Sequence, residues 1–260
     1  MLQEISQRHQ IFAHRGANKE AVEQGLCIAE NSRAAFTRAL LAPIEGIETD
    51  VQLSSDNVPL LWHDWYLDKL GHPGKRVDDF TFKQLSHLDF ANTSCQGALP
   101  EKVLSLQEFI KTYGNRCQLN IEIKSFDSES AQRRQTKIRQ TMAILNAPSL
   151  HDVFISSFSL SCLEFAHQEV NNFPLFYLMS DHYKHSDLSQ LMRSHAFLKG
   201  FCLPITSLDQ TTIDLLRNSG KVIATYTCNS NEELDKAFAL GVDILISDYP
   251  QLALSMRSKL

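Results

Sequence analysis

Short runs of β-branched and apolar residues alternate with amphipathic segments along most of the chain. The runs have the length and composition of buried strands, and the amphipathic segments have the apolar spacing of helices that bury one face. The predicted strands are Gln10–Ala13, Gly46–Val51, Leu119–Lys124, Val153–Ser157, Leu175–Met179, Lys199–Leu203, Val222–Thr227 and Ile244–Ser247. Among the predicted helices are Ser32–Leu41, Ser105–Thr112, Ser130–Leu145, Thr211–Ser219 and Asn231–Leu240.

Strands that alternate with helices predict βα units around a parallel sheet. Eight such units in 260 residues fit a single α/β domain with the TIM (β/α)8 barrel fold, which typically needs about 250 residues. An open, doubly wound sheet is the alternative. One stretch, residues 64–104, is too long for a plain βα loop and contains a short helical pattern, Thr81–Leu88. We expect a small insertion there, at the catalytic rim of the barrel.

Charge and composition narrow the classes of function. The net charge is −5, and the chain has no stripe of Lys or Arg of the kind that nucleic-acid binding requires. It also has no signal-peptide pattern and no apolar run of the roughly 20 residues that cross a bilayer. The six cysteines are scattered without zinc spacing and read as buried thiols rather than disulfides. A cytoplasmic enzyme that binds a small molecule, without stable membrane insertion, is the expectation.

The first predicted strand ends in His14-Arg15-Gly16. An imidazole exchanges protons near neutral pH, and a guanidinium holds a phosphate through two parallel hydrogen bonds. Gly16 allows the chain to turn directly after the strand. A surface His-Arg pair at a turn is the alternative interpretation of this motif alone.

The second predicted strand carries Glu48 and Asp50 on one face, because side chains alternate across a strand. In a barrel, the apolar face formed by Ile47 and Val51 packs against the helices, so both carboxylates point inward. Two inward carboxylates repel one another and are costly to desolvate unless a cation compensates them. A hard divalent metal such as Mg²⁺ or Ca²⁺ explains the pair. An edge strand with a solvated polar face is the alternative.

The next predicted strand repeats this arrangement. Glu122 and Lys124 share the inward face with Asn120, while two isoleucines alternate with them. Glu122 is a candidate third carboxylate ligand, and Lys124 is a candidate partner for a phosphate oxygen. A plain Glu–Lys salt bridge is the alternative.

A further apolar run, Leu60-Leu61-Trp62, ends in His63-Asp64. Together with His14 it supplies two imidazoles at the ends of apolar runs, the number needed for one general acid and one general base. With ten histidines in the chain, chance placement is the alternative, and the coincidence with the carboxylates speaks against it.

In this order the motifs resemble the glycerophosphodiester phosphodiesterase family. The HRG, Glu-Asn box, ExD, HD and IEIK-like strand of that family correspond to residues 14–16, 30–32, 48–50, 63–64 and 121–124. Residues 225–229 and 241–250 are similar to its last two motifs. Two departures stand out: Ala29 replaces a proline before the Glu-Asn box, and Tyr226 replaces a tryptophan.

The resemblance implies a role for each matching residue. It implies a TIM barrel whose divalent metal is held by three carboxylates, Glu48, Asp50 and Glu122. His14 and His63 would be the acid–base pair, and Arg15 and Lys124 would contact the phosphate. Tyr226 would form part of the wall that packs against glycerol.

The implied reaction is hydrolysis of a glycerophosphodiester to sn-glycerol 3-phosphate and an alcohol. The attacking oxygen is either water or the neighbouring glycerol hydroxyl, and the sequence does not indicate which histidine is the acid. Lysophospholipase D activity on lysolipids uses the same residues and is one alternative. A barrel that binds a phosphate ligand without turnover is another. The alcohol, the native metal and the oligomeric state are not indicated by the sequence.

Overall fold

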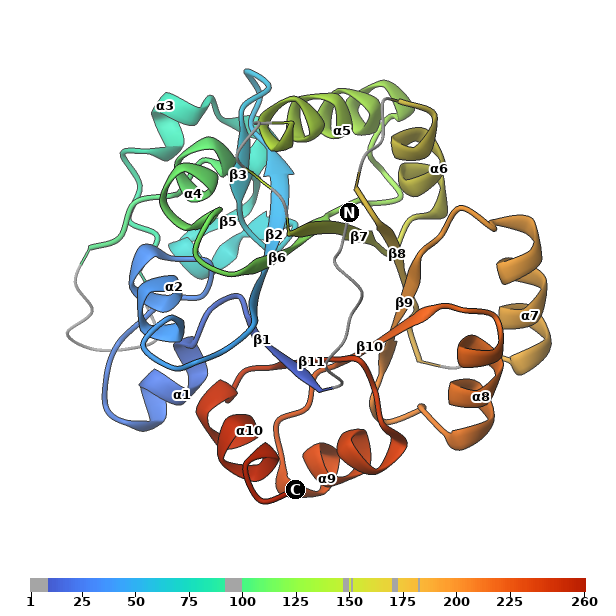
Figure 1. Cartoon of the computed structure of the whole chain (residues 1–260). Coiled ribbons are helices and arrows are strands. Elements are labelled where there is room, and N and C mark those ends of the chain that lie inside the picture. The colour runs from blue at the N-terminus through green and yellow to red at the C-terminus, as the bar shows by residue number, and fades with distance from the viewer. Residues whose placement is uncertain (1–8, 92–99, 147–149, 151, 170–172, 182) are drawn as a thin grey trace.

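Eight parallel strands form a closed ring (Figure 1). The computed structural model describes residues 9–91, 100–146, 150, 152–169, 173–181 and 183–260. The ring strands are β1 (Gln10–His14), β2 (Gly46–Leu53), β6 (Gln118–Ile123), β7 (Val153–Ser157), β8 (Leu175–Leu178), β9 (Gly200–Pro204), β10 (Val222–Tyr226) and β11 (Ile244–Ser247). The ring closes because β1 pairs with both β2 and β11. The predicted TIM barrel is therefore confirmed, and an open sheet is excluded.

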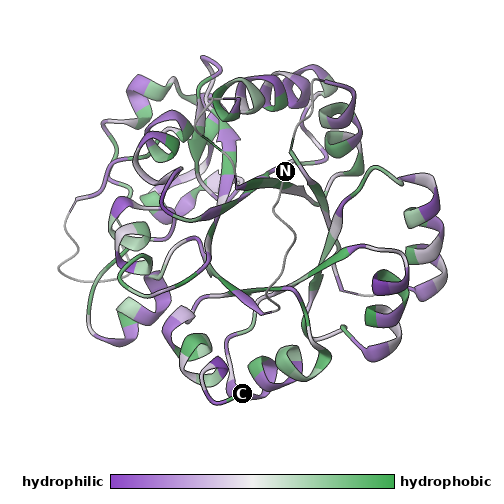
Figure 2. Ribbon diagram, viewed as in Figure 1, coloured by the Kyte–Doolittle hydropathy of each residue, from purple (hydrophilic) through white to green (hydrophobic). Residues whose placement is uncertain are grey.

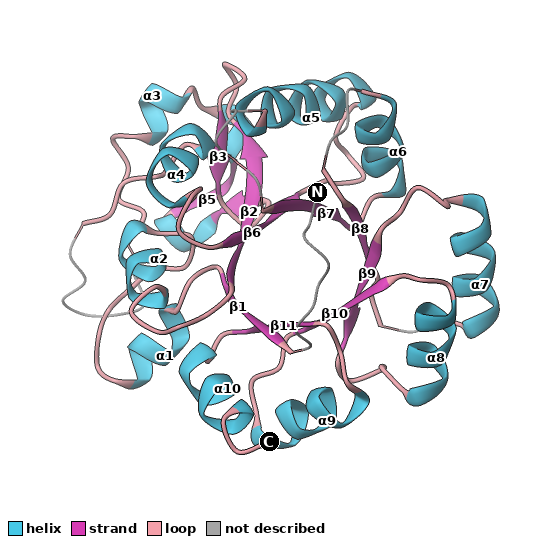
Figure 3. Ribbon diagram, in the orientation of Figure 1, coloured by secondary structure: helices cyan, strands magenta, loops and turns pink. Residues whose placement is uncertain are grey.

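The helices surround this ring (Figure 3). They are α1 (Asn18–Glu23), α2 (Arg33–Ala39), α4 (Leu106–Tyr113), α5 (Ala131–Leu145), α6 (Leu160–Gln168), α7 (His185–Ser194), α8 (Gln210–Asn218), α9 (Asn231–Leu240) and α10 (Pro250–Arg257). A side-chain oxygen caps the first turn of six of them, from Ser32, Ser105, Ser130, Ser159, Asp209 and Ser230. Within the described ranges, no helix has the length and apolar character to cross a membrane.

The core has two layers, because the side chains of each barrel strand alternate between the helices and the barrel interior. In the outer layer, Ile47 and Ile121 pack among residues of the surrounding helices, including Phe109. The inner layer contains Phe12, Phe154, Phe176, Leu178, Cys202, Ala224, Ile244 and Ile246. Figure 2 shows hydrophobic residues on the strands and on the barrel-facing sides of the helices.

Residues 59–91 form an excursion outside the ring. They contain β3 (Pro59–Leu61), β4 (Tyr66–Leu67), η1 (Asp68–Leu70), β5 (His72–Arg76), η2 (Val77–Asp79) and α3 (Phe82–Leu85). The predicted helix Thr81–Leu88 is thus shorter than expected. A small apolar cluster of this region includes Leu60, Trp62, Leu67 and Leu85. Residues 92–99 lie outside the described ranges.

His63 therefore does not follow a barrel strand. The short strand before it, β3, is antiparallel to β2 and pairs only with it in the sheet, with Leu61 opposite Val51. This pairing returns the chain toward Asp50, whose carbonyl accepts a hydrogen bond from the Trp62 amide at 3.2 Å. An antiparallel turn-back, rather than a further βα unit, places the second histidine.

The cysteines correct one expectation. Cys117, Cys162, Cys202 and Cys228 are free, as predicted, and all but the partly exposed Cys117 are buried. Cys27 is disulfide-bonded, so the prediction of thiols alone was wrong for this residue. Cys95 lies outside the described residues.

Two glycines make room for phenylalanines of the inner layer. Gly46 pairs with Phe12 across β1 and β2, and Gly200 pairs with Phe176 across β8 and β9. A Cβ at Gly46 would lie 2.3 Å from the Phe12 ring, and one at Gly200 would lie 2.4 Å from the Phe176 ring. No real Cβ tolerates such contacts, so the small residue is a packing requirement here.

We expect Gly200→Ala to lower the free energy of unfolding by about 1–3 kcal/mol, the usual cost of overpacking a tight core. Denaturant titration followed by circular dichroism measures this. The double variant Gly200→Ala/Phe176→Leu removes the ring that the new methyl group meets, so it should lose less stability than the two single changes added together. An unchanged stability of Gly200→Ala would contradict this account of the inner layer.

Candidate active site

A cavity of about 170 Å³ opens at the C-terminal ends of the barrel strands. Seven of the eight residues singled out in the sequence line it: His14, Arg15, Glu48, His63, Glu122, Lys124 and Tyr226. The eighth, Asp50, is fully buried and contacts both Arg15 and Lys124. Asn120, Phe158, Leu178, Thr227 and Ile246 complete the lining. The structure thus brings together side chains from the first strand to the last.

Three carboxylates form the centre of the site. Glu48, Asp50 and Glu122 each offer an oxygen atom within 4.8 Å of the others. The parallel register of β2 and β6 causes this proximity, because it places Asp50 beside Glu122. These residues are only 3%, 0% and 8% exposed, respectively. Buried carboxylates so close together need compensating positive charge.

Two cations supply part of that charge. The Lys124 ammonium lies 2.7 Å from Glu122 Oε1 and 3.5 Å from Asp50 Oδ1. Arg15 Nε lies 3.1 Å from Asp50 Oδ2, and Arg15 Nη1 donates to Glu30 at 3.1 Å. Three carboxylates face two cations, and Arg15 is shared with Glu30, so at least one negative charge of the centre lacks a compensating cation.

The two carboxylates of β2 respond differently to this environment. Burial, together with the charges of Asp50 and Glu122, raises the pKa of Glu48 well above its ordinary value of 4.5. Burial alone would raise the pKa of Asp50 as well, but the charges of Arg15 and Lys124 outweigh it and hold that pKa below the ordinary value. Glu48 is therefore the carboxylate of the centre whose negative charge is least compensated and which most readily takes up a proton.

The donor set fits a divalent metal. Glu48 Oε1 and Asp50 Oδ1 are buried and accept no hydrogen bond from the described residues; Lys124 Nζ lies 3.5 Å from Asp50 Oδ1. Such unpaired oxygens are unusual in a protein interior. Three carboxylates are ligands that hard cations such as Mg²⁺, Mn²⁺ or Ca²⁺ prefer. A cation bound there would compensate the excess negative charge and satisfy both oxygens.

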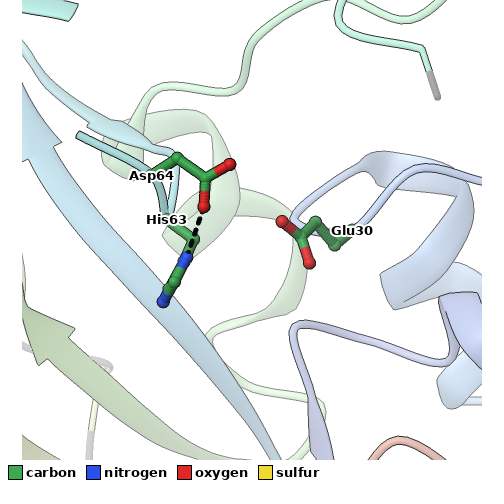
Figure 4. A group of neighbouring side chains, drawn as sticks. All are labelled: Glu30, His63 and Asp64. Atoms are coloured by element: carbon green, nitrogen blue, oxygen red, sulfur yellow. Dashed lines mark hydrogen bonds and ion pairs between the residues drawn. The ribbon is translucent and has the colours of Figure 1, made fainter. Parts of the chain in front are cut away.

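A second group of potential ligands consists of Glu30, His63 and Asp64 (Figure 4). It comes from two different loops, and Glu30 faces the His63–Asp64 pair across the gap between them. The Lys69 ammonium already lies 3.1 Å from Glu30 Oε1 and 2.8 Å from Asp64 Oδ2. Lys69 therefore pairs with both carboxylates of this group, and Arg15 also pairs with Glu30. The group is more exposed than the buried centre, so a metal is less needed there to compensate its charge.

Both histidines are held by a carboxylate through Nδ1. His63 Nδ1 lies 2.7 Å from Asp64 Oδ1, and His14 Nδ1 lies 2.7 Å from Asp248 Oδ1. A ring held through Nδ1 presents Nε2 for proton transfer. His14 Nε2 lies 3.9 Å from Glu48 Oε2, so this nitrogen faces the acidic centre.

Several polar residues that hold the site were given no role in the sequence analysis, although Asn31 belongs to the Glu-Asn box. Asn31, buried and with a positive φ of 54°, donates to Asp50 Oδ2 at 2.9 Å and accepts from Thr49 Oγ1 at 2.7 Å. Gln52 donates to the carbonyls of Trp62, at 3.1 Å, and His63, at 3.3 Å. Gln52 follows Glu48 and Asp50 at the same spacing of two, which was the signal available for it. The φ of Asn31 was not readable from sequence.

Part of the cavity lining is apolar and aromatic, formed by Phe158, Leu178, Tyr226 and Ile246. Tyr226 contributes its ring rather than its hydroxyl, because the hydroxyl donates to the Met179 carbonyl at 2.6 Å. The Phe158 ring lies 6.1 Å from the Tyr226 ring and remains 42% exposed at the rim. The pocket thus has a charged side and an aromatic side, which suits a phosphate that carries an organic group. Fold and site together define a TIM-barrel enzyme for a small anionic ester.

Comparison with known proteins identifies the family. Residues 14–252 match the glycerophosphoryl diester phosphodiesterase family, and the chain belongs to it. It is 25% identical over 257 residues to the glycerophosphodiester phosphodiesterase of Bacillus altitudinis, which covers 96% of this chain and 98% of that protein. An Oleispira antarctica phosphodiesterase, whose structure contains the product sn-glycerol-3-phosphate, has a TM-score of 0.81 at 24% identity, over 96% of this chain and 97% of that one. The protein is a phosphodiesterase.

We expect Glu48→Gln to stabilise the metal-free protein and to abolish its stabilisation by metal. A carboxyl whose pKa is raised by folding loses its contribution to stability as the pH rises above its unfolded value, here 4.5. The variant should therefore melt at a higher temperature than the wild type in EDTA at neutral pH, and the difference should shrink toward pH 4.5.

Thermal unfolding with and without excess Mg²⁺ or Mn²⁺ tests both parts. At a metal concentration about 100 times the dissociation constant, a bound ion stabilises a protein by about 2.7 kcal/mol. Glu45→Gln is the matched control, since Glu45 pairs with Arg257 just before the same strand and should leave the response to metal intact. Equal stabilisation of Glu48→Gln and wild type by metal would contradict the assignment.

Proposed function

We propose that the chain hydrolyses glycerophosphodiesters to sn-glycerol 3-phosphate and an alcohol, with a divalent metal and two histidines. The observation that carries this proposal is the convergence of two carboxylate-held imidazoles on one cavity with a buried acidic centre. A pure binding site has no need for two proton-transfer groups. The sn-glycerol-3-phosphate in the structurally similar Oleispira antarctica protein supports the choice of substrate class.

The metal would be held by Glu48, Asp50 and Glu122. When bound, a divalent cation supplies Lewis-acid polarisation of the phosphoryl group and a fixed positive charge. Arg15 and Lys124 bind and orient the phosphate, and their charges favour the additional negative charge of the transition state. Both are already held in place by carboxylates, so they do not have to reorganise during the reaction.

The histidines move the protons. One imidazole takes the proton of the attacking oxygen through Nε2 as this oxygen bonds to phosphorus. The phosphorus–oxygen bond to the alcohol then breaks, and the second imidazole gives a proton to the departing oxygen. His14 and His63 enter the cavity from different strand ends, as removal and delivery of a proton at two different oxygens require. Tyr226 contributes the apolar wall for the carbon skeleton of glycerol.

We also propose that the chain, residues 1–260, forms a single domain with an insertion at 64–104, and that the described residues of this insertion border the leaving-group side of the site. Trp65 of this segment packs on Phe126, with ring centroids 3.9 Å apart, and Arg76 lies over the Trp65 ring at 4.8 Å. Phe126 and Phe158 line a neighbouring cavity together with Ser125, Ser159 and Ser161. This position would let the insertion contact the alcohol.

We expect His14→Ala and His63→Ala each to lower kcat by at least about 100-fold, because a positioned proton-transfer group contributes roughly 10²–10⁴-fold. Release of glycerol 3-phosphate from glycerophosphocholine, coupled to a dehydrogenase, measures the rate. His87→Ala is the matched control: this histidine is exposed, contacts the Lys83 carbonyl and should leave kcat unchanged. Near-normal turnover of both site variants, with normal melting temperatures, would refute the assignment.

The substrate class is tested on EDTA-treated wild-type protein. Glycerophosphocholine, glycerophosphoethanolamine and a lysolipid dispersion are each supplied with Mg²⁺, Mn²⁺ or Ca²⁺. Metal-dependent release of glycerol 3-phosphate from the first two is the expected result. Turnover of the lysolipid alone would favour lysophospholipase D activity, and no turnover of any substrate would favour a binding role.

A further inference from the structure

The two histidine–carboxylate pairs of the site differ in origin. His63 and Asp64 are neighbours in sequence, and Asp64 is 27% exposed and shared with the Lys69 ammonium. His14 and Asp248 are 234 residues apart. Their side chains meet because β1 and β11 are parallel neighbours with Ala13 beside Ser247. The next residue of each strand, His14 and Asp248, therefore lies side by side with the other at the mouth of the barrel.

The Asp248 carboxylate is buried and both of its oxygens are hydrogen-bonded. It is 2% exposed and accepts hydrogen bonds at Oδ2 from Asn229 Nδ2, at 2.7 Å, and from Lys19 Nζ. Asn229 Oδ1 in turn accepts from the Asp248 amide at 2.9 Å. Burial alone raises the pKa of Asp248, but the hydrogen bond from His14 and the contact with Lys19 outweigh it and lower that pKa. The residue is thus an anchored carboxylate whose other oxygen, Oδ1, meets His14 Nδ1.

An anchored carboxylate at Nδ1 has a defined chemical consequence for a neutral histidine. The Nδ1–H tautomer is favoured because Nδ1 can then donate to Asp248, and Nε2 is left unprotonated. The ring is also fixed in orientation, with Nε2 at 3.9 Å from Glu48 Oε2 in the acidic centre. When the ring is protonated, the same carboxylate stabilises its charge.

We propose that Asp248 is a positioning residue for the reaction, which keeps His14 in the Nδ1–H tautomer with Nε2 directed at the phosphate. This inference rests on the proposed role of His14 in proton transfer. Asp248 reaches neither the cavity lining nor the carboxylate centre, so it acts only through the histidine. The structural alternative is that Asp248 serves to anchor α1 through Lys19.

Asp248→Asn separates these roles, because the amide preserves shape but offers an NH₂ group that favours the opposite tautomer. The equivalent substitution in Ser-His-Asp enzymes lowers kcat by about 10⁴-fold. We expect a fall in kcat of roughly 10²–10⁴-fold with KM changed less than about threefold. Lys19→Met removes the anchor of α1 but leaves the pair with His14, and should lower kcat less than about tenfold.

Asp243→Asn is the matched control, because Asp243 directly precedes β11 whereas Asp248 directly follows it. The Asp243 carboxylate accepts a hydrogen bond from the Ile223 amide at 2.8 Å, so the variant should lower stability without lowering kcat. A double-variant cycle completes the design. In a His14→Ala background, Asp248→Asn should cause little further loss, because the group through which it acts is absent. A full, multiplicative loss in that background, or a kcat of Asp248→Asn within threefold of wild type, would overturn the proposal.

The tautomer itself is measured without turnover. Long-range ¹H–¹⁵N spectra of the ¹⁵N-histidine-labelled wild-type protein, at a pH where His14 is neutral and with His14→Ala for assignment, should show a protonated Nδ1. A protonated Nε2 would overturn the proposal even if Asp248→Asn failed to fold. The tautomer measurement also separates a failure of the proposed function from a failure of the proposed role of Asp248. A wild-type protein that turns over no substrate would refute the proposed function, whereas the tautomer of His14 would still decide the role of Asp248.

Discussion

The burial of three carboxylates at the mouth of the barrel is the constraint on which the rest of the site depends. Glu48, Asp50 and Glu122 lie in an environment that penalises each negative charge, and the cations around them compensate only part of it. Arg15 and Lys124 neutralise two charges. The remainder appears as the raised pKa of Glu48 and as carboxylate oxygens without hydrogen-bond partners. This excess of negative charge favours the binding of a divalent cation. The bound cation would in turn favour an anionic substrate.

The closed barrel makes this arrangement rigid. Glu48, Asp50 and Glu122 project from two directly paired strands, and main-chain hydrogen bonds fix their separation. The barrel interior contains a cluster of buried apolar side chains that includes Phe12, Phe154 and Phe176. The same low polarity that makes the carboxylates costly also strengthens their interactions with cations. Stability is thus given up locally for a preorganised site, while two apolar layers hold the fold.

The sequence predicted the ring strands well and the supporting contacts poorly. All eight predicted strands are present, because buried parallel strands are short apolar runs between amphipathic helices. The alternation argument placed Glu48 and Glu122 correctly in the cavity. It could not show that His63 follows a strand outside the ring, that Asn31 adopts a positive φ, or that Cys27 forms a disulfide. Each of these depends on contacts that the local pattern of residues does not specify.

By itself, then, the sequence determined the alternation of strands and helices, the faces on which polar side chains interrupt apolar strands, and the motifs of the family. These properties are local, since periodicity and side-chain direction follow from a few consecutive residues. Only the tertiary structure decided which groups hold one another. His14 meets Asp248 because β11 closes the barrel against β1, and Arg15 meets Asp50 because the first strand also pairs with the second. Ring closure and strand register create those pairs, and neither can be inferred from any short stretch of the sequence.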